Sequence, residues 1–309
     1  MHAAERLELL IVRTGSLLAA AQLDHMLEQC SPRELQCNFG YVPMTVPPEL
    51  RQLSIQLDEW TKLEHAGSSI EQALGGLVYR LRHSSLETLE LSLGYCSVVA
   101  APVCMPHIVS LNVDFTLVDH KSIDLSWLQA QPVDHLCLNI TVRSQDAAQQ
   151  LRLIRQLQLL SIHWLCLELE AAVSEQVQRQ WARLELVNEM SLYLPPSEMH
   201  ISELPRSKCM YIHGCPEKAA LPAITISWSA ICSSRSRTRI SPGHHGQVIY
   251  IIDAPGHLPD RSHPWEFEIE KPEAFCGLPD AIRSLDADKC GRYRLQNAAA
   301  LRQSDAAGS

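Results

Sequence analysis

The feature that most constrains the fold is a short apolar pattern that recurs along the chain. Each copy has an apolar residue, two variable residues, a second apolar residue, one variable residue and a third apolar residue. The clear copies are Leu50-Leu53-Ile55, Leu86-Leu89-Leu91, Ile108-Leu111-Val113, Val133-Leu136-Leu138, Ile162-Leu165-Leu167 and Val187-Met190-Leu192. Weaker copies are Ala4-Leu7-Leu9, Pro32-Leu35-Cys37, Ser207-Met210-Ile212 and Leu221-Ile224-Ile226. Because the last two apolar residues alternate with a variable one, each copy predicts a short strand with one buried face.

The spacing of these triplets predicts a repeat array. Their middle residues recur mostly at about 20 to 29 residues, with a longer step between Leu53 and Leu89 and a shorter one between Met210 and Ile224. Four intervening segments, 16–29, 69–82, 144–158 and 174–184, have the apolar periodicity of helices, and Ser16 is a candidate N-cap of the first. Prolines in 95–107 favour a loop there. A strand and its return segment cannot bury their apolar side alone, so we expect stacked units that share one core.

This arrangement resembles the leucine-rich-repeat family, in its long, helix-containing class typified by ribonuclease inhibitor and F-box proteins. The resemblance covers roughly residues 4–228 and rests on the triplets. It implies an α/β solenoid, with a curved parallel sheet on the concave side and helices and loops on the convex side. The chain departs from the family after each strand, where the usual Asn is mostly missing; Leu93-Gly94-Tyr95-Cys96 offers one Cys-type equivalent.

The C-terminal third differs in composition. Residues 233–239 are polar and basic, 247–253 and 265–270 have the pattern of strands, and 297–309 has the composition of a mobile tail. We therefore predict a solenoid over 1–228, a β-containing cap or small module over 229–296, and a flexible tail over 297–309. A cap is favoured because an open solenoid edge needs covering.

Charge and composition exclude some classes of protein. The 309 residues carry 26 Lys and Arg against 35 Asp and Glu, a net charge of −9, which disfavours nucleic-acid binding. No apolar run approaches the length of a membrane span, and residues 1–10 lack the layout of a signal peptide. We expect a cytoplasmic chain whose 11 cysteines are reduced thiols, Cys137 and Cys166 included, although their matching positions also allow a disulfide.

Candidate catalytic and metal sites are weak. The sequence has no phosphate-binding loop, no Gly-x-Ser-x-Gly elbow and no His-Glu-x-x-His pair. Cys209 and Cys215 could offer soft metal ligands, but the sequence has no second pair of ligating residues with matching spacing to complete a four-ligand site. Cys276 with His244, His245, His257 or His263 is the candidate for a thiol-dependent enzyme, against the simpler interpretation of solvated loop histidines. No cofactor or metal is predicted.

The variable positions of the triplets define a candidate binding face. Because the triplets point inward, the residues beside them should point to the concave surface. The predicted partner-binding residues are the acids Asp58, Glu87, Glu90, Asp114, Asp134, Glu168, Glu170 and Glu189, with Trp164 and Tyr193 as aromatic anchors. Arg51 is the main basic residue there, and His135 and His163 are near neutral. The acids either form a negative stripe for a basic protein segment or keep the sheet soluble.

We therefore expect a non-catalytic scaffold that recognises another protein through the concave face. One alternative, implied by the family resemblance alone, is a substrate-recognition subunit of a ubiquitin ligase. Another is a Cys/His-dependent hydrolase or transferase that uses the C-terminal region. The sequence leaves the identity of the partner and the oligomeric state open.

Overall fold

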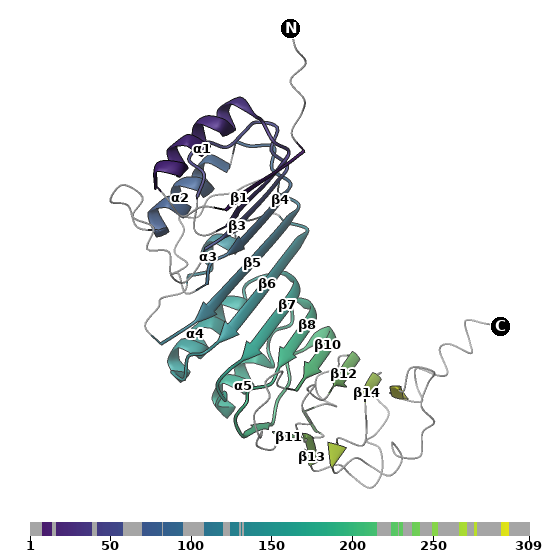
Figure 1. Cartoon of the computed structure of the whole chain (residues 1–309). Coiled ribbons are helices and arrows are strands. Elements are labelled where there is room, and N and C mark those ends of the chain that lie inside the picture. The colour runs from purple at the N-terminus through teal and green to yellow at the C-terminus, as the bar shows by residue number, and fades with distance from the viewer. Residues whose placement is uncertain are drawn as a thin grey trace, which may run out of the picture. The chain divides into compact units, whose positions relative to one another are not determined.

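The computed structural model describes residues 8–13, 17–38, 42–57, 70–81, 83–94, 108–119, 124–129, 131, 133–214, 224–227, 229–230, 237–241, 249–252, 266–270, 275–276 and 292–296. The chain divides into two compact units, Met1–Ile140 (unit 1) and Thr141–Ser309 (unit 2). Each unit contains parallel strands and helices (Figure 1). The predicted α/β class with a parallel sheet is therefore confirmed.

Unit 1 is a run of parallel strands with helices between them. Its strands are β1 (Leu9–Arg13), β2 (Glu34–Asn38), β3 (Gln52–Gln56), β4 (Thr88–Ser92) and β5 (Ser110–Leu117), and each pairs in parallel with the next. β6 (His135–Val142) begins in this unit and extends past its end. The helices are α1 (Leu17–Gln29), α2 (Ile70–Leu81) and the short α3 (Ser126–Gln129). The helices predicted over 16–29 and 69–82 are thus confirmed; Ser16 and the loop predicted over 95–107 lie outside the described residues.

Strand register places the predicted triplets side by side in the core of unit 1. Leu35, Leu53, Leu89 and Leu111 follow one another across β2 to β5, and each is almost completely buried. A second buried row, displaced by two residues, runs from Cys37 through Ile55 and Leu91 to Val113. Because side chains alternate between the two faces of a strand, these rows fix one face as core and leave the other to solvent.

The first triplet was predicted in the wrong register. Leu9, expected in the core, is 42% exposed, whereas Leu10 and Val12 pair with the buried Leu35 and Cys37. The spacing of apolar residues fits a triplet ending at Leu9 as well as one ending at Val12. A slip of one residue moves every side chain to the other face, and the pairing with β2 selects the second alternative.

Unit 2 combines two sheets with two helices. In the first sheet, β7 (Ile162–Leu169), β8 (Val187–Tyr193), β10 (Ser207–His213), β12 (Arg237–Ser241) and β14 (Glu266–Glu270) pair in parallel, and β16 (Arg292–Gln296) is antiparallel to β14. In the second, β9 (Met199–Ile201), β11 (Ile224–Ser227), β13 (Ile249–Ile252) and β15 (Phe275–Cys276) are parallel. The helices α4 (Ala147–Leu157) and α5 (Glu175–Trp181) confirm those predicted over 144–158 and 174–184.

From β8 onward the chain alternates between the two sheets, which corrects one predicted triplet. Ile224 and Ile226 are buried as expected, but they belong to β11 in the second sheet and not to the series that contains Met210. The next strand beside β10 is β12, where Thr238 pairs with Met210 and restores a regular interval. The strands predicted over 247–253 and 265–270 are confirmed as β13 and β14. Parallel pairing thus continues across residue 228, where a boundary was predicted.

Buried glutamines in the helices of unit 2 form hydrogen bonds with neighbouring backbone groups. Asp146 caps α4, and Ser174 caps α5. Gln150, four residues after the first cap, donates a 2.7 Å hydrogen bond to the carbonyl of Ser144. Gln178, four residues after the second cap, donates to the carbonyl of His200 at 2.7 Å and accepts from the Ser202 N–H at 2.8 Å. Gln178 therefore bonds α5 to β9, where the return segment changes from helix to strand.

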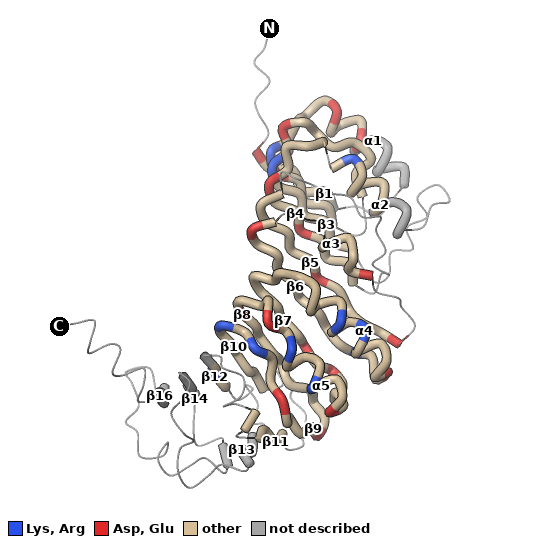
Figure 2. Tube along the Cα trace, turned by 180° about the vertical axis from the view of Figure 1, so that it is seen from behind, with Lys and Arg blue, Asp and Glu red and all other residues tan. Residues whose placement is uncertain are grey.

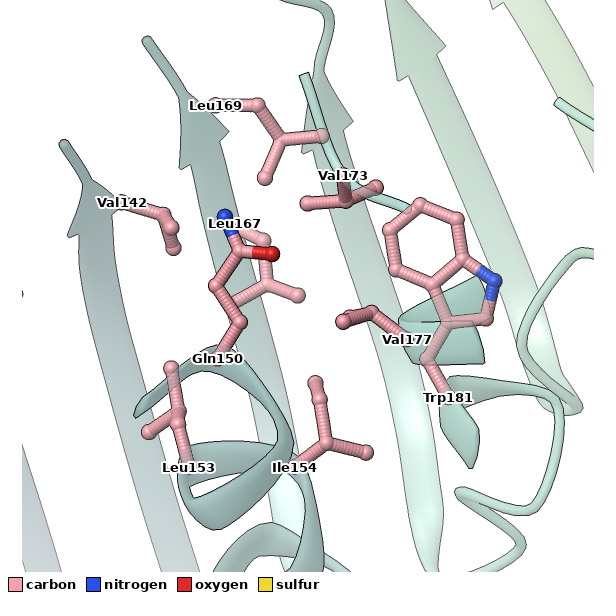
Figure 3. Close-up of a pocket in the computed structure, with 9 residues that line it drawn as sticks. All are labelled: Val142, Gln150, Leu153, Ile154, Leu167, Leu169, Val173, Val177 and Trp181. Atoms are coloured by element: carbon pink, nitrogen blue, oxygen red, sulfur yellow. The ribbon is translucent and has the colours of Figure 1, made fainter. Parts of the chain in front are cut away.

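A small cavity lies between α4, α5 and the strands they cover (Figure 3). Its lining is Val142, Gln150, Leu153, Ile154, Leu167, Leu169, Val173, Val177 and Trp181. The space suffices for about one water molecule. It is a packing defect of the core and too small for an organic ligand.

Candidate functional site

The candidate site lies on the face of the strands that is not used for the core. We call it the open face of each unit: the strand residues that alternate with the buried ones, away from the helices (Figure 1). In unit 1 most of these residues are neutral and polar; they are Gln52, Ser54, Gln56, Thr88, Ser92, Ser110, Asn112 and Thr116. Over β3 to β5 such a surface is well hydrated, whereas β1 exposes Leu9 and Ile11 on the same face.

Two predicted acids, Glu90 and Asp114, lie on the open face of unit 1. Both are exposed, and both have neutral neighbours in register: Ser54 and Asn112 beside Glu90, Ser92 beside Asp114. In Figure 2 the acidic positions of unit 1 are separated by tan stretches of the tube. Burial raises the pKa of Asp114, and the hydrogen bond from the Ser92 hydroxyl partly opposes that rise. These acids are isolated charges in a polar surface and do not touch one another in register.

Two further predicted acids precede the strands. Glu87, just before β4, forms a 2.9 Å ion pair with Arg51, so its charge is compensated. Both side chains are more than half exposed, and such a pair contributes between about zero and 1 kcal/mol. Asp134 is exposed just before β6. Asp58 lies outside the described residues.

The three predicted acids of unit 2 differ in their surroundings. Glu170, at the end of β7, forms a 2.6 Å ion pair with Arg143. Glu168 is half-buried, accepts a 3.3 Å hydrogen bond from the Thr141 hydroxyl and has no ion-pair partner among the described residues. Glu189 is also half-buried, and its position on β8 is in register with Trp164. Two of the three carboxylates thus remain uncompensated beside aromatic residues.

Aromatic side chains gather on the open face of unit 2. The ring centroids of Trp164 and Tyr211 lie 6.1 Å apart with 31° between the planes. Those of Tyr193 and His213 lie 4.5 Å apart in a stacked arrangement. All four rings are half-buried, and together we call them the aromatic patch. The Trp164–Tyr211 pair spans β8, since Trp164 belongs to β7 and Tyr211 to β10.

Burial at the centre of the patch supports this geometry. Ser191 belongs to the open face of β8 and is in register with Cys166 on one side and Tyr211 on the other. A small polar residue on such a face is ordinarily exposed, yet Ser191 is only 4% exposed. The larger neighbouring side chains therefore cover it, and the patch presents rings at its surface.

The patch is uncharged at neutral pH and has charged groups beside it. Burial, and secondarily the charge of Arg239 on β12, lower the pKa of His213. Burial, together with Cys166 and Glu168, raises the pKa of Tyr193. Glu189 is in register with Trp164, and Glu168 with Tyr193, so rings and carboxylates together make a surface suited to planar or cationic groups. Arg239 is in register with Tyr211 at the other edge of the patch, where it disfavours a further cation.

Two of the four residues of the aromatic patch were predicted from the sequence. Trp164 and Tyr193 were predicted as anchors, but they do not pair with each other; each contacts a residue of β10. Tyr211 and His213 were missed, although they occupy the variable positions around Met210 and Ile212 in a recognised triplet. Arg143, which neutralises Glu170, and Arg239 were missed as well, because the partner strands of their residues were not known.

The cysteines show no arrangement for catalysis among the described residues. None of Cys137, Cys166 and Cys209 forms a disulfide. Burial raises the pKa of Cys137, which disfavours the reactive thiolate. Cys276 lies in β15, while Cys215 and the histidines predicted to act with Cys276 lie outside the described residues. Among the described residues, no group of His, Cys, Asp and Glu is placed to hold a metal, and no helix is long and apolar enough to cross a membrane.

Comparison with known proteins finds no matching family model, curated protein or solved structure. The assignment of function therefore depends on the residues themselves, above all on the aromatic patch and the two uncompensated carboxylates next to it.

Proposed function

We propose that this chain is a non-catalytic protein-interaction scaffold of the leucine-rich-repeat type that binds a partner protein through the open face of its parallel strands. The observation that carries the proposal is the aromatic patch of Trp164, Tyr193, Tyr211 and His213 on a sheet face that none of the described helices covers. Tryptophan and tyrosine dominate the residues whose removal weakens protein interfaces most. Rings fixed on adjacent strands also lose little conformational freedom when a partner binds.

The leucine-rich-repeat assignment is supported by the order and spacing of the strands. In each unit successive open-face strands pair in parallel, and their buried residues recur at intervals close to those of that family. The return segments are helices up to α5 and strands of a second sheet afterwards, so the repeat is irregular. What recurs in the open-face strands from β2 to β10 is a buried pair of apolar residues, and in β12 the buried pair is Thr238 and Ile240.

The chemistry of the partner follows from charge. The net charge is −9, and Glu90, Asp114, Glu168 and Glu189 lie on the open faces without a described ion-pair partner. A basic segment would be attracted to this surface over about a Debye length, roughly 8 Å at physiological salt. We therefore propose a partner protein with a basic segment. Cys30, Cys37, Cys137, Cys166 and Cys209 form no disulfide, which fits a reducing compartment such as the cytoplasm.

The test compares affinity capture by three forms of the full chain. The double variant Trp164→Ala/Tyr211→Ala removes one aromatic pair from the open face. Tyr79→Ala removes an exposed aromatic side chain from α2, away from that face, and is the matched control. Circular dichroism establishes that each form is folded.

The proposal expects proteins that are retained by the wild type and by Tyr79→Ala and lost from the double variant, identified by mass spectrometry and confirmed with the purified partner. If a confirmed partner binds the double variant as tightly as the wild type, the aromatic patch is not the binding site and the proposal is wrong.

A further inference from the structure

The position of Glu189 relative to the aromatic patch narrows the chemistry of the partner. Glu189 on β8 is in register with Trp164 on β7 and with Cys209 on β10, and Tyr211 is two residues beyond Cys209. Its carboxylate position thus lies next to the Trp164–Tyr211 pair, whose centroids are 6.1 Å apart. One negative charge and two ring faces are therefore brought together on three adjacent strands.

The charge of Glu189 is not compensated by an ion pair within the described part of the chain. No cation among the described residues forms an ion pair with it, in contrast to Glu170, which Arg143 neutralises at 2.6 Å. Glu189 is half-buried and so partly removed from water. A half-buried carboxylate beside aromatic rings is stabilised by an external cation more strongly than a fully hydrated one, because screening by water is weaker there.

We propose that Trp164, Glu189 and Tyr211 form the anchor site for an arginine side chain of a basic peptide segment. The guanidinium group lies flat on the rings and donates hydrogen bonds to the Glu189 carboxylate. A planar guanidinium can stack and donate in its own plane at the same time, whereas a lysine ammonium is a compact, strongly hydrated charge. Glu168, on β7, supplies a second carboxylate for a neighbouring basic residue of the same peptide. This inference rests on the proposed function and deepens it.

The experiment uses the full chain and three synthetic twelve-residue peptides with a fluorescent label. In each, four positions separated by Gly and Ser carry arginine, lysine or citrulline. Citrulline keeps the planar shape of arginine but has no charge. Fluorescence anisotropy gives the affinity of each peptide at low and at physiological salt.

The expected order is arginine first, lysine several-fold weaker and citrulline at least about tenfold weaker. Glu189→Gln and Trp164→Leu should each weaken the arginine peptide about tenfold. Glu175→Gln is the matched control, since it removes the same charge from α5, away from the open face, and it should leave the affinity unchanged. Equal binding of citrulline and arginine, or wild-type affinity of Glu189→Gln, would overturn the arginine site.

The two proposals fail separately. If the double variant Trp164→Ala/Tyr211→Ala loses a confirmed partner while Glu189→Gln retains it and the arginine peptide does not bind, the interaction surface stands and the arginine site is wrong. If the confirmed partner binds the double variant as tightly as the wild type, the proposed interaction surface itself is wrong.

Discussion

At the residue scale, single side chains take one of two environments according to their place in a strand. Leu53 and Leu111 are buried in the row that the triplets form, while Ser54 and Asn112, one residue further on, face the open side. Replacing a buried leucine with alanine ordinarily costs about 2–5 kcal/mol, and changes at exposed positions cost much less. Stability is therefore concentrated in the buried rows and not in the residues of the open face.

Two adjacent glycines in α2 give a prediction about stability. Glycine inside a helix is about 1 kcal/mol less favourable than alanine. A Cβ at Gly75 would meet nothing within 4 Å, whereas a Cβ at Gly76 would lie 3.2 Å from an Arg80 nitrogen. Gly75→Ala should raise the free energy of unfolding by about 0.5–1 kcal/mol, measured by chemical denaturation. Gly76→Ala should gain less. Gly94→Ala, at a φ of +52°, should lose about 1–2 kcal/mol instead.

The lowered pKa of His213 predicts a pH dependence. In the unfolded chain this histidine titrates near its ordinary value of 6.5, and in the folded chain it binds its proton less readily. The unfolded state therefore binds more protons as the pH falls through 6.5, and the free energy of unfolding falls with it until the pH passes below the lowered pKa. His213→Phe keeps a ring beside Tyr193 but cannot be protonated. The stability difference between the wild type and His213→Phe should thus shift against the wild type between pH 7.5 and pH 5; a constant difference would contradict this.

At the element scale, unit 2 changes its return segments from helix to strand, and side-chain hydrogen bonds join the two types. Gln178 of α5 bonds the backbone of β9 at His200 and Ser202, and the Trp181 indole N–H donates to the carbonyl of Glu203 at 2.8 Å. On the side of a short strand that faces a helix, the backbone N–H and C=O groups have no neighbouring strand to bond with. These two side chains satisfy them and hold β9 against α5.

Gln178→Ala tests how much the hydrogen bonds between α5 and β9 contribute to stability, and Gln150→Ala is the matched substitution. Gln178→Ala leaves the His200 carbonyl and the Ser202 N–H without their partner, so we expect a loss of about 2–4 kcal/mol. Gln150→Ala, at the equivalent position of α4, removes one bond to the Ser144 carbonyl and should cost about 1–2 kcal/mol. Hydrogen exchange should accelerate in β9 for Gln178→Ala and not for Gln150→Ala. If the two substitutions lowered the free energy of unfolding and changed hydrogen exchange equally, the bonds between α5 and β9 would contribute no more than the single bond of Gln150.

At the scale of the whole molecule, charge sets the approach of a partner. The net charge is −9, and acids lie on the open faces of both units. Long-range attraction depends on the sum of such charges, so their spacing matters less for the association rate than for the bound complex.

Charge reversal measures this contribution. Changing Glu90, Asp114 and Glu168 together to Lys moves the net charge from −9 to −3. The association rate with a basic partner should fall about tenfold at low ionic strength, and the difference should shrink as salt rises. The control changes Glu28, Glu175 and Glu198, exposed acids off the open faces, to the same net charge. Equal association rates for the two triple variants would remove the open-face acids from the recognition of the partner.

The part of the site that could be predicted follows from local periodicity. Trp164, Glu168, Glu189 and Tyr193 were assigned to the solvent side because they alternate with Leu165, Leu167, Met190 and Leu192 in the same short strands. Whether each charge is compensated could not be predicted. Arg51 and Arg143 reach Glu87 and Glu170 across 36 and 27 residues of sequence, and only the pairing of strands brings them together.

The sequence by itself determined the buried rows, the positions of four helices and the parallel α/β class. Each of these depends on the spacing of apolar residues within a short segment of sequence. The tertiary structure decided the register of β1, the transfer of β11 to a second sheet and the contacts of the aromatic patch. Leu9 and Leu10 are equally apolar candidates for the same place, so local pattern does not separate them. The sequence of β11 (Ile224–Ser227) fits the apolar pattern better than that of β12 (Arg237–Ser241), although β12 is the strand that lies beside β10. Non-local strand pairing does, because it satisfies the backbone hydrogen bonds of a whole strand at once and so selects one register among alternatives that bury similar apolar side chains.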